Sequence, residues 1–363
     1  MKLIAILLIF LGTCTAHAFP EMIRYGYVNC TACHVSPAGG GVLTPYGRGL
    51  SSEVLSTWGS EKEAQFLHGA LPMEKVQDWL LVGGDYRGLQ YHYENDKVKD
   101  GEWINMQGLI EAAVKFKNWT LNIAAGKFDQ EGVWTPETTR YYVMDQINDY
   151  VSARVGRFIP QFGLNIPEHI SPTREFLGFG AYDERDAAEL QYADENWTTT
   201  ASYSKAPSDH PDSDETAVSI RVEKVFADTF KPGFSAWRGE NNQFSRQIYG
   251  LHGLFGFTKK LFLLSEVDWQ EQHLKSSHTI QHSAVAYQKL GYELYKGVVG
   301  LCLADGELST LEDPATQIYH YGLGVQFFPR PHFEIETAWT LEHAPQTTSV
   351  ESNYAWILLH YYL

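Results

Sequence analysis

Hydrophobic and polar residues alternate one by one along most of the chain from residue 79 to the C-terminus. Residues 218–223 read Val-Ser-Ile-Arg-Val-Glu, and residues 104–116, 263–270, 319–327 and 333–342 follow the same rule. A period of two puts hydrophobic side chains on one face of a β-strand and polar side chains on the other. The pattern therefore predicts a mainly β domain over residues 79–363.

The connections between these stretches also alternate, between tight turns and longer polar loops. Tight turns are predicted at 117–118, 148–149, 195–196, 227–228, 259–260, 295–296 and 329–331. Longer loops are predicted at 94–101, 129–138, 159–184, 206–212, 239–243, 271–277, 304–315 and 343–350. This arrangement is typical of a transmembrane antiparallel β-barrel of the bacterial outer membrane, and the count gives about 16 strands. The last strand alternates up to Leu363.

A soluble β-sandwich or propeller would also show this alternation. Strands of about ten residues, an aromatic content of 14% and a strand at the very end of the sequence favour the barrel. Aromatic residues near strand ends are then expected to lie at the membrane interfaces, in contact with outer-membrane lipid.

The charge balance of the chain limits the classes of partner that it can bind. Asp and Glu number 44 against 28 Lys and Arg, for a net charge of −16, which argues against a nucleic-acid partner. The polar positions of the strands predict an acid-leaning lumen that favours cations or admits a basic cytochrome. The residues expected to face inward are Asp85, Glu111, Glu223, Glu266, Asp268, Glu334, Glu336, Glu342, Arg87, Lys115, Arg154 and Arg221.

Residues 1–18 read as a secretory signal peptide. Lys2 precedes an apolar run from Leu3 to Leu11, and Ala16-His17-Ala18 supplies an A-x-A cleavage site. Export fits the barrel prediction and places the mature chain in the bacterial outer membrane.

Cys30-Thr31-Ala32-Cys33-His34 is the attachment signature of c-type haem. Two thiols two residues apart can reach the two vinyl groups on one edge of the macrocycle, and the adjacent imidazole can bind the iron. We expect one covalent haem c, held by Cys30 and Cys33 with His34 as proximal ligand. A redox C-x-x-C, a disulfide and half of a zinc site are the alternatives.

The motif opens a small haem module over residues 19–78, loop-rich and partly helical. A glycine-rich run follows it at 36–50, and Ser60 with Glu63 forms a capping box that predicts a short helix. The sixth iron ligand is open among His68, Met73, Met22, water or none, and His68 is preferred because it follows the predicted helix. The module lies on the periplasmic side or in the barrel lumen.

Two parts of the sequence resemble known classes of protein. The barrel region resembles 16-stranded bacterial porins in organisation. The run Cys30 to Gly41, C-x-x-C-H-x-S-P-x-G-G-G, resembles that of haem-bearing outer-membrane proteins of the porin–cytochrome type. The second resemblance implies electron transfer at or through the outer membrane, with periplasmic or lumen-inserted cytochromes as partners. A homo-oligomer is one arrangement open to such a barrel.

The loop 159–184 stands where general porins fold a loop inward to narrow the pore. Its candidate constriction residues are Glu168, His169, Arg174 and Glu175. The main functional prediction is an electron-transfer barrel, and the alternative is a diffusion porin whose haem module is a plug, redox gate or sensor. A haem enzyme such as a peroxidase is disfavoured, because no distal acid–base motif is present.

Overall fold

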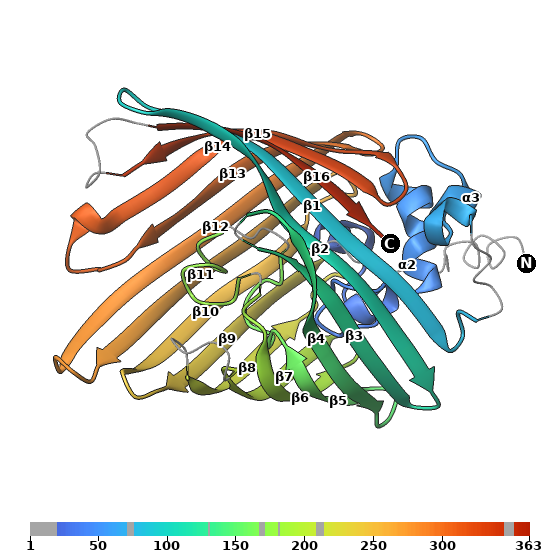
Figure 1. The fold of residues 1–363 in the computed structure, drawn as a ribbon, viewed down its shortest axis with the longest axis horizontal. Helices are drawn as coiled ribbons and strands as arrows, with labels where there is room; N and C mark the ends of the chain where they lie inside the picture. Colours follow the sequence, from blue (N-terminus) through green and yellow to red (C-terminus); the bar gives the residue numbers. More distant parts are fainter. Residues whose placement is uncertain are drawn as a thin grey trace, which may run out of the picture.

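The computed structural model describes residues 20–70, 76–129, 131–166, 171–180, 182–207, 214–344 and 352–363. The predicted signal peptide therefore lies outside the described residues, as do Met73, Glu168 and His169. Sixteen strands form one closed barrel in which every strand pairs with its neighbours in sequence and β16 pairs with β1 (Figure 1). The predicted fold class, including the strand number, is confirmed.

The strands are β1 (Leu80–Glu94), β2 (Lys99–Phe116), β3 (Trp119–Phe128), β4 (Trp134–Gln146), β5 (Val151–Phe158), β6 (Arg185–Ala193), β7 (Trp197–Lys205), β8 (Thr216–Lys224), β9 (Phe230–Glu240), β10 (Phe244–Gly256), β11 (Leu261–Leu274), β12 (Thr279–Tyr295), β13 (Val298–Leu308), β14 (Gln317–Arg330), β15 (Phe333–His343) and β16 (Ser352–Tyr362). The helical elements are η1 (Pro20–Tyr25), η2 (Cys30–Ala32), α2 (Pro45–Leu50), η3 (Ser51–Leu55), α3 (Glu61–Ala64), η4 (Phe66–Gly69) and η6 (Pro314–Thr316). Among the described helices, none has the length and apolar character needed to cross a bilayer.

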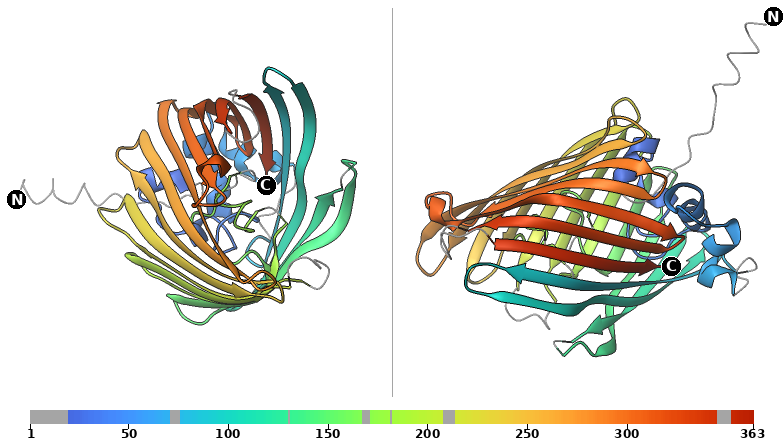
Figure 2. Two further views of the ribbon diagram at one scale, coloured as in Figure 1. Left: turned by 90° about the vertical axis from the view of Figure 1, so that its left-hand side faces the viewer. Right: turned by 90° about the horizontal axis from the view of Figure 1, so that it is seen from above.

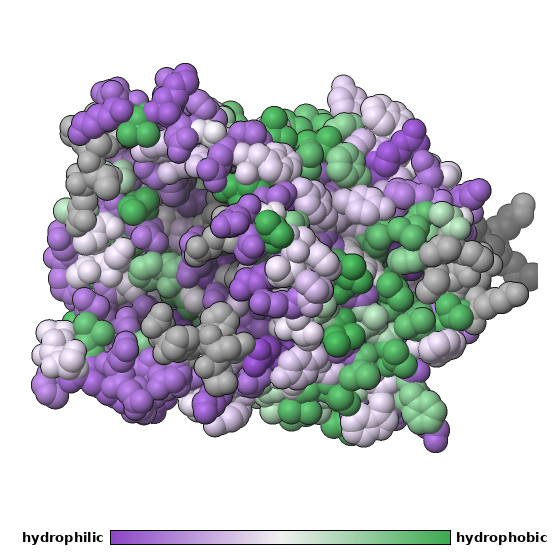
Figure 3. All heavy atoms as spheres, viewed as in Figure 1, coloured by the Kyte–Doolittle hydropathy of each residue, from purple (hydrophilic) through white to green (hydrophobic). Residues whose placement is uncertain are grey.

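Side-chain burial is inverted relative to a water-soluble protein. Glu111 is 3% exposed while its neighbour Ile110 is 61% exposed, and Glu334 and Glu336 are buried while Trp339 is 49% exposed. The polar face of each strand therefore looks into the barrel and the apolar face looks out, as the alternation predicts. Figure 3 shows the hydrophobic side chains gathered on the outer face of the barrel, with hydrophilic residues at the end that carries the long loops.

The barrel wall is uneven in height. β5 to β8 have only 8 or 9 residues each, whereas β2 has 18 and β12 has 17. On the low side, the chain leaves β5 at Phe158 and returns at Arg185 through the β5–β6 loop (residues 159–184), whose described part lies inside the ring of strands (Figure 1).

Residues 20–70, called here the N-terminal segment, occupy the barrel end where the tight turns lie. Thr57 and Trp58 donate backbone hydrogen bonds to Phe328 and Pro329 at 2.8 and 3.0 Å, next to the turn between β14 and β15. The views in Figure 2 show the first part of this segment within the ring of strands, and α3 outside its end. The capping box of Ser60 and Glu63 is present at the start of α3, as predicted.

Candidate functional site

The Cys30–His34 motif forms a single helical turn. The backbone N–H groups of Cys33 and His34 donate to the Cys30 carbonyl at 3.1 and 2.9 Å. Cys30 and His34 each border a cavity, whereas Cys33 is 1% exposed and lines neither of the two. Thr44 holds the turn in place, because its hydroxyl donates to the Ala32 carbonyl at 2.9 Å and its N–H donates to the Cys33 carbonyl at 2.8 Å.

Helix α2 packs directly against Cys33, which is 1% exposed. A Cβ atom at Gly47 would lie 2.5 Å from the Cys33 carbonyl oxygen, so only glycine permits this approach. A Cβ atom at Gly49, two residues further on, would meet no atom within 4 Å. The two glycines of this short helix therefore differ in role, and Gly47 is the one that allows α2 to contact the motif.

Three contacts tie the motif region to the inner wall of the barrel. Lys231 Nζ donates to the Val28 carbonyl at 2.7 Å, and the Thr198 hydroxyl donates to Asn29 Oδ1 at 3.1 Å. Just after the motif, Arg154 Nη1 donates to the Ser36 hydroxyl at 3.4 Å. The motif is therefore held inside the lumen by side chains of β5, β7 and β9.

His332, in the turn between β14 and β15, secures the end of the N-terminal segment. It is fully buried, its backbone N–H donates to Ser51 Oγ at 2.7 Å, and its Nε2 lies 2.7 Å from the Ala64 carbonyl oxygen. Burial lowers the pKa of His332 to about 4, with the positive charge of Arg48 acting in the same direction. The imidazole is therefore neutral at neutral pH and donates through Nε2.

Two cavities flank the motif. The cavity that His34 lines, called here the His34 cavity, contains about 1510 Å³ of empty space, part of it open to solvent. Its apolar walls are formed by Leu43, Leu50, Phe158 and Phe179. The Cys30 cavity contains about 760 Å³, and Gln161, Gln191, Thr198 and Glu223 are among the residues that line it. Ala38, Gly39 and Gly40 line both cavities, so the two spaces meet along a stretch of chain with almost no side chains.

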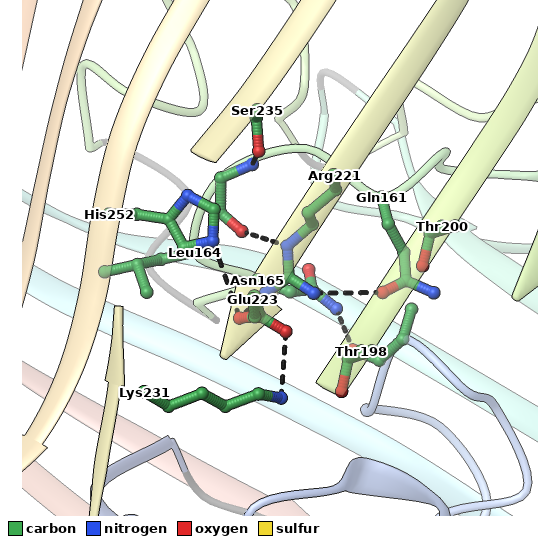
Figure 4. A network of polar contacts seen from close by, with 12 residues as sticks. Gln161, Leu164, Asn165, Thr198, Thr200, Arg221, Glu223, Lys231, Ser235 and His252 are labelled. Carbon is green, nitrogen blue, oxygen red and sulfur yellow. Dashed lines mark hydrogen bonds and ion pairs between the residues drawn. The ribbon is translucent and has the colours of Figure 1, made fainter. Parts of the chain in front are cut away.

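The wall of the Cys30 cavity carries a buried polar network, drawn in Figure 4. Glu223 is its centre, and its carboxylate contacts Arg221 Nη2 at 2.6 Å, Lys231 Nζ at 2.8 Å and His252 Nε2 at 3.5 Å. Arg221 Nε also donates to the Gly163 carbonyl of the β5–β6 loop at 2.8 Å. The Glu223 carboxylate thus links Lys231, which holds the N-terminal segment, to Arg221, which holds the β5–β6 loop.

The β5–β6 loop packs against the inner wall of β9 to β12. Phe162 and Phe179 stack at 4.8 Å between ring centroids and join Trp237 in one buried cluster, and Leu164 joins Phe262 in another. Among the predicted constriction residues, Arg174 is buried and lines the His34 cavity, whereas Glu175 is exposed. The structure therefore brings one residue of that set to the cavity beside the Cys30–His34 motif, and Glu168 and His169 lie outside the described part.

His68 lies away from the motif. Its side chain is exposed, its Nε2 is 3.1 Å from the Tyr361 hydroxyl, and it is not among the described residues that line the His34 cavity. Met22, the other described candidate for a sixth ligand, is buried in a cluster with Tyr27, Leu55 and Phe328. The imidazole that does share the cavity with His34 is His360, held between Asp85 at 2.9 Å and Glu334 at 2.7 Å.

The residues present fit a covalent haem better than the alternatives. Neither cysteine of the motif is in a disulfide. Burial raises the pKa of both thiols, that of Cys33 to about 12, which is opposite to the lowered pKa of a redox-active C-x-x-C thiol. Within the described residues no group of three His, Cys, Asp or Glu side chains is arranged to hold a metal ion. Cys30 and His34 border cavities that share a glycine-lined stretch of chain, and such a lining suits a flat cofactor.

The His34 cavity is richer in cations than the sequence predicts. Four arginines line it against the carboxylates Asp85 and Glu184; these arginines are Arg87, Arg140, Arg154 and Arg174. The acid-leaning lumen is therefore not found at this place. The sequence alone does not show which strand face looks inward near Pro136, so it does not mark Arg140 as a lumen residue. Arg174 arrives on a loop rather than on a strand, where alternation gives no direction.

The sequence patterns also do not identify Lys231 and His332 as the residues that hold the N-terminal segment in place. In the sequence Lys231 has the character of an ordinary strand residue, and His332 lies in a predicted turn next to Pro331. Lys231 falls on the polar face of its strand, two residues before Gly233, and this is only a weak signal that it points into the lumen. No local signal in the sequence points to His332.

The barrel is similar in fold to solved structures of outer-membrane barrel proteins. The structure is similar to the trimer form of OmpT, an outer membrane protein of Vibrio cholerae, with a TM-score of 0.60 at 8% identity over 78% of this chain and 99% of that one. An anion-selective porin from Comamonas acidovorans matches with a TM-score of 0.60 at 7% identity, over 78% and 99% of the two chains. OprB of Pseudomonas putida matches with a TM-score of 0.63 at 7% identity, over 86% and 99%.

No protein-family model matches the sequence, and no curated protein matches it. At these identities the similarity defines the fold, a 16-stranded barrel of the outer-membrane porin type.

Proposed function

We propose that this chain is an outer-membrane channel of the porin type whose periplasmic mouth is plugged by an N-terminal segment bearing one covalent haem c. The observation that carries the proposal is the position of the Cys30–His34 turn, which wall residues hold inside the lumen. In outer-membrane barrels the short turns face the periplasm. The plug therefore lies at the periplasmic end, and the chain is a channel rather than an enzyme.

Cys30 and Cys33 would hold the haem through thioether bonds, and His34 would bind its iron. A bound c-type haem supplies one-electron chemistry and a spectroscopic signal at this place. Thr44 and Gly47 keep the turn in position, and the apolar walls of the His34 cavity would pack against the body of the haem.

Passage of solutes requires that the plug or the β5–β6 loop moves. Both are attached to Glu223, the plug through Lys231 and the loop through Arg221. A change in charge beside Cys30 acts on this buried network, because electrostatic interactions are strong where water is excluded. We infer that the oxidation state of the haem alters the seating of the plug, which makes the segment a redox gate.

Electron transfer at the outer membrane is the second candidate, and the opening of the His34 cavity to solvent favours it. The N-terminal segment and the β5–β6 loop occupy the lumen beside the motif. A partner cytochrome is therefore expected to dock at the periplasmic mouth rather than to thread through the barrel. His68, exposed on that side, is then a contact residue or a distal ligand that moves inward.

Oligomerisation belongs to the proposal as well. The similar Vibrio cholerae protein has a trimer form. Because the wall is low at β5 to β8, we expect copies of this chain to pack together there, with lipid around the remaining wall.

One set of measurements tests these functions. A haem stain and a reduced-minus-oxidised spectrum on purified outer membranes test the cofactor, with Cys30→Ser/Cys33→Ser and His34→Ala as variants.

Single-channel conductance in planar bilayers is then recorded at oxidising and reducing potential. The gate predicts a conductance that changes with potential in the wild type and not in the double cysteine variant. Conductance that is independent of potential, together with reduction of a dye trapped in vesicles, would favour electron transfer. A colourless wild-type protein contradicts both.

A further inference from the structure

Two arginines present loosely held guanidinium groups to the His34 cavity. Arg140, on β4, has its nearest carboxylate contacts at 3.7 Å to Glu184 and 4.0 Å to Glu111. Both distances exceed hydrogen-bond length. A guanidinium carries five N–H donors, so these two carboxylates attract Arg140 while leaving donors for a further acceptor.

Arg174, from the β5–β6 loop, is in a similar position. It is 5% exposed, and its hydrogen bond in the described structure is from Nη1 to the Phe162 carbonyl at 3.3 Å. Its guanidinium lies 5.9 Å from the centre of the Phe179 ring. The carboxylates of Glu266, Asp183 and Asp268 act on it only at longer range, beyond the 4.0 Å of an ion pair.

The other two arginines of the cavity differ from these. Arg154 is bound by Glu189, with Nε and Nη2 at 2.7 and 2.6 Å from the same carboxylate oxygen. Arg87 lies 3.4 Å from Asp85, which also holds His360. Arg140 therefore has two carboxylates in ion-pair range with neither within hydrogen-bond distance, and Arg174 has no carboxylate in that range among the described residues.

A buried charge without a carboxylate in ion-pair range, as at Arg174, is costly, so this part of the cavity favours a further anion. Planar guanidinium groups match carboxylates through paired hydrogen bonds. The apolar walls formed by Leu43, Leu50, Leu55, Phe158 and Ile166 suit the hydrophobic body of the same ligand. The cavity thus has the composition of a site for a large, flat, mostly apolar molecule that carries carboxylates.

We propose that Arg140 and Arg174 form a carboxylate-binding site in the His34 cavity, and that its occupants are the propionate groups of the haem attached at Cys30 and Cys33. This assignment rests on the proposed function, because it requires that haem. The same chemistry would bind the carboxylates of a free organic acid passing through the channel, and the test separates the two sources.

The test measures the midpoint potential of the full-length, haem-bearing protein in detergent by spectroelectrochemical titration. Arg140→Gln and Arg174→Gln each remove a positive charge that favours the reduced haem. Each is expected to lower the reduced-to-oxidised ratio at fixed ambient potential by roughly tenfold, which for a one-electron couple is about 59 mV. Arg140→Lys and Arg174→Lys keep the charge and should restore most of the ratio.

Arg185→Gln is the matched control, because Arg185 is also buried, is paired with Glu215 at 3.2 Å and does not line this cavity. It should leave the potential nearly unchanged. Retention of the heat-modifiable band on gels shows that each variant still forms a barrel. Unchanged potentials in both Gln variants would overturn the assignment to haem.

Succinate is the probe for the other source, with binding followed by tryptophan fluorescence and by block of single-channel current. With propionates on the two arginines, succinate should have no effect on haem-bearing wild-type protein and should bind the Cys30→Ser/Cys33→Ser variant. Succinate binding to haem-bearing wild type that is lost in both Gln variants would assign the site to a free acid and overturn the haem assignment. If the wild type proves to lack haem, the proposed function fails, while succinate binding that depends on Arg140 and Arg174 still establishes the carboxylate site.

Discussion

Lys231 and Glu223, on the neighbouring strands β9 and β8, form an ion pair of 2.8 Å inside the barrel, and the same ammonium group donates to the Val28 carbonyl at 2.7 Å. Both side chains are almost fully buried. The wall is thereby linked to the backbone of the N-terminal segment two residues before the haem motif.

The first prediction concerns this link. Lys231→Met removes the donor to Val28 and one partner of a buried ion pair, which weakens the seating of the N-terminal segment by about 3 kcal/mol. Single-channel conductance should rise, and added protease should cleave within residues 20–70 faster than in wild type. Lys224→Met is the control, because Lys224 lies over the rings of Trp197 and Phe226 rather than at Glu223. Equal conductance in the Lys231 variant and wild type would show that the link does not hold the plug.

The second prediction is a pH dependence set by His332. Its pKa in the folded protein is about 4, below the value of about 6.5 for an exposed histidine. His332 therefore binds a proton more tightly when the N-terminal segment is released from the turn than when the segment is seated. The seating is at full strength above about pH 6.5, weakens as the pH falls below that value, and has lost on the order of 3 kcal/mol near pH 4.

Protease cleavage of the N-terminal segment measured between about pH 7.5 and about pH 4.5 checks this sign. Cleavage should accelerate towards acid pH in wild type. His332→Gln keeps an N–H donor near Ala64 but does not titrate, so its cleavage rate should depend much less on pH. The same steep acid dependence in the Gln variant would assign the effect to another group.

The third prediction uses two glycines of one helix. Gly47→Ala places a Cβ 2.5 Å from the Cys33 carbonyl oxygen and displaces the Cys30–His34 turn, so the covalent haem per barrel that the proposed function requires should fall several-fold. Gly49→Ala meets nothing within 4 Å and should keep the wild-type haem content, with a gain of up to about 1 kcal/mol in helix propensity. Haem stain against protein stain on one gel measures the ratio. Equal haem content in both variants would mean that attachment tolerates movement of α2.

The fourth prediction concerns the β5–β6 loop. Phe179 is 1% exposed and packs between Phe162 and Trp237, so Phe179→Ala should cost about 3–5 kcal/mol of loop packing. The loop should then fluctuate, which would give larger and noisier single-channel currents. Phe226→Ala, at an exposed turn position, should leave the currents as in wild type. A quiet, unchanged trace from the Phe179 variant would remove the loop from the conduction path.

The period-two alternation of the sequence was sufficient to define the barrel, its 16 strands and the positions of nearly all its turns, because strand faces and tight turns depend on residues close together in sequence. The Cys30–His34 motif and the capping box at Ser60 are local for the same reason.

The location of the Cys30–His34 motif was decided only by the tertiary structure. The side chains that seat it, Lys231, Thr198 and Arg154, lie between 118 and 203 residues away from their partners in the N-terminal segment. These contacts exist only after the barrel closes, and the segment itself has no regular pattern that predicts a binding surface. The sequence therefore specified a barrel and a haem-type motif, and the closed barrel specified that the motif lies inside the lumen, beside arginines that no local pattern distinguishes.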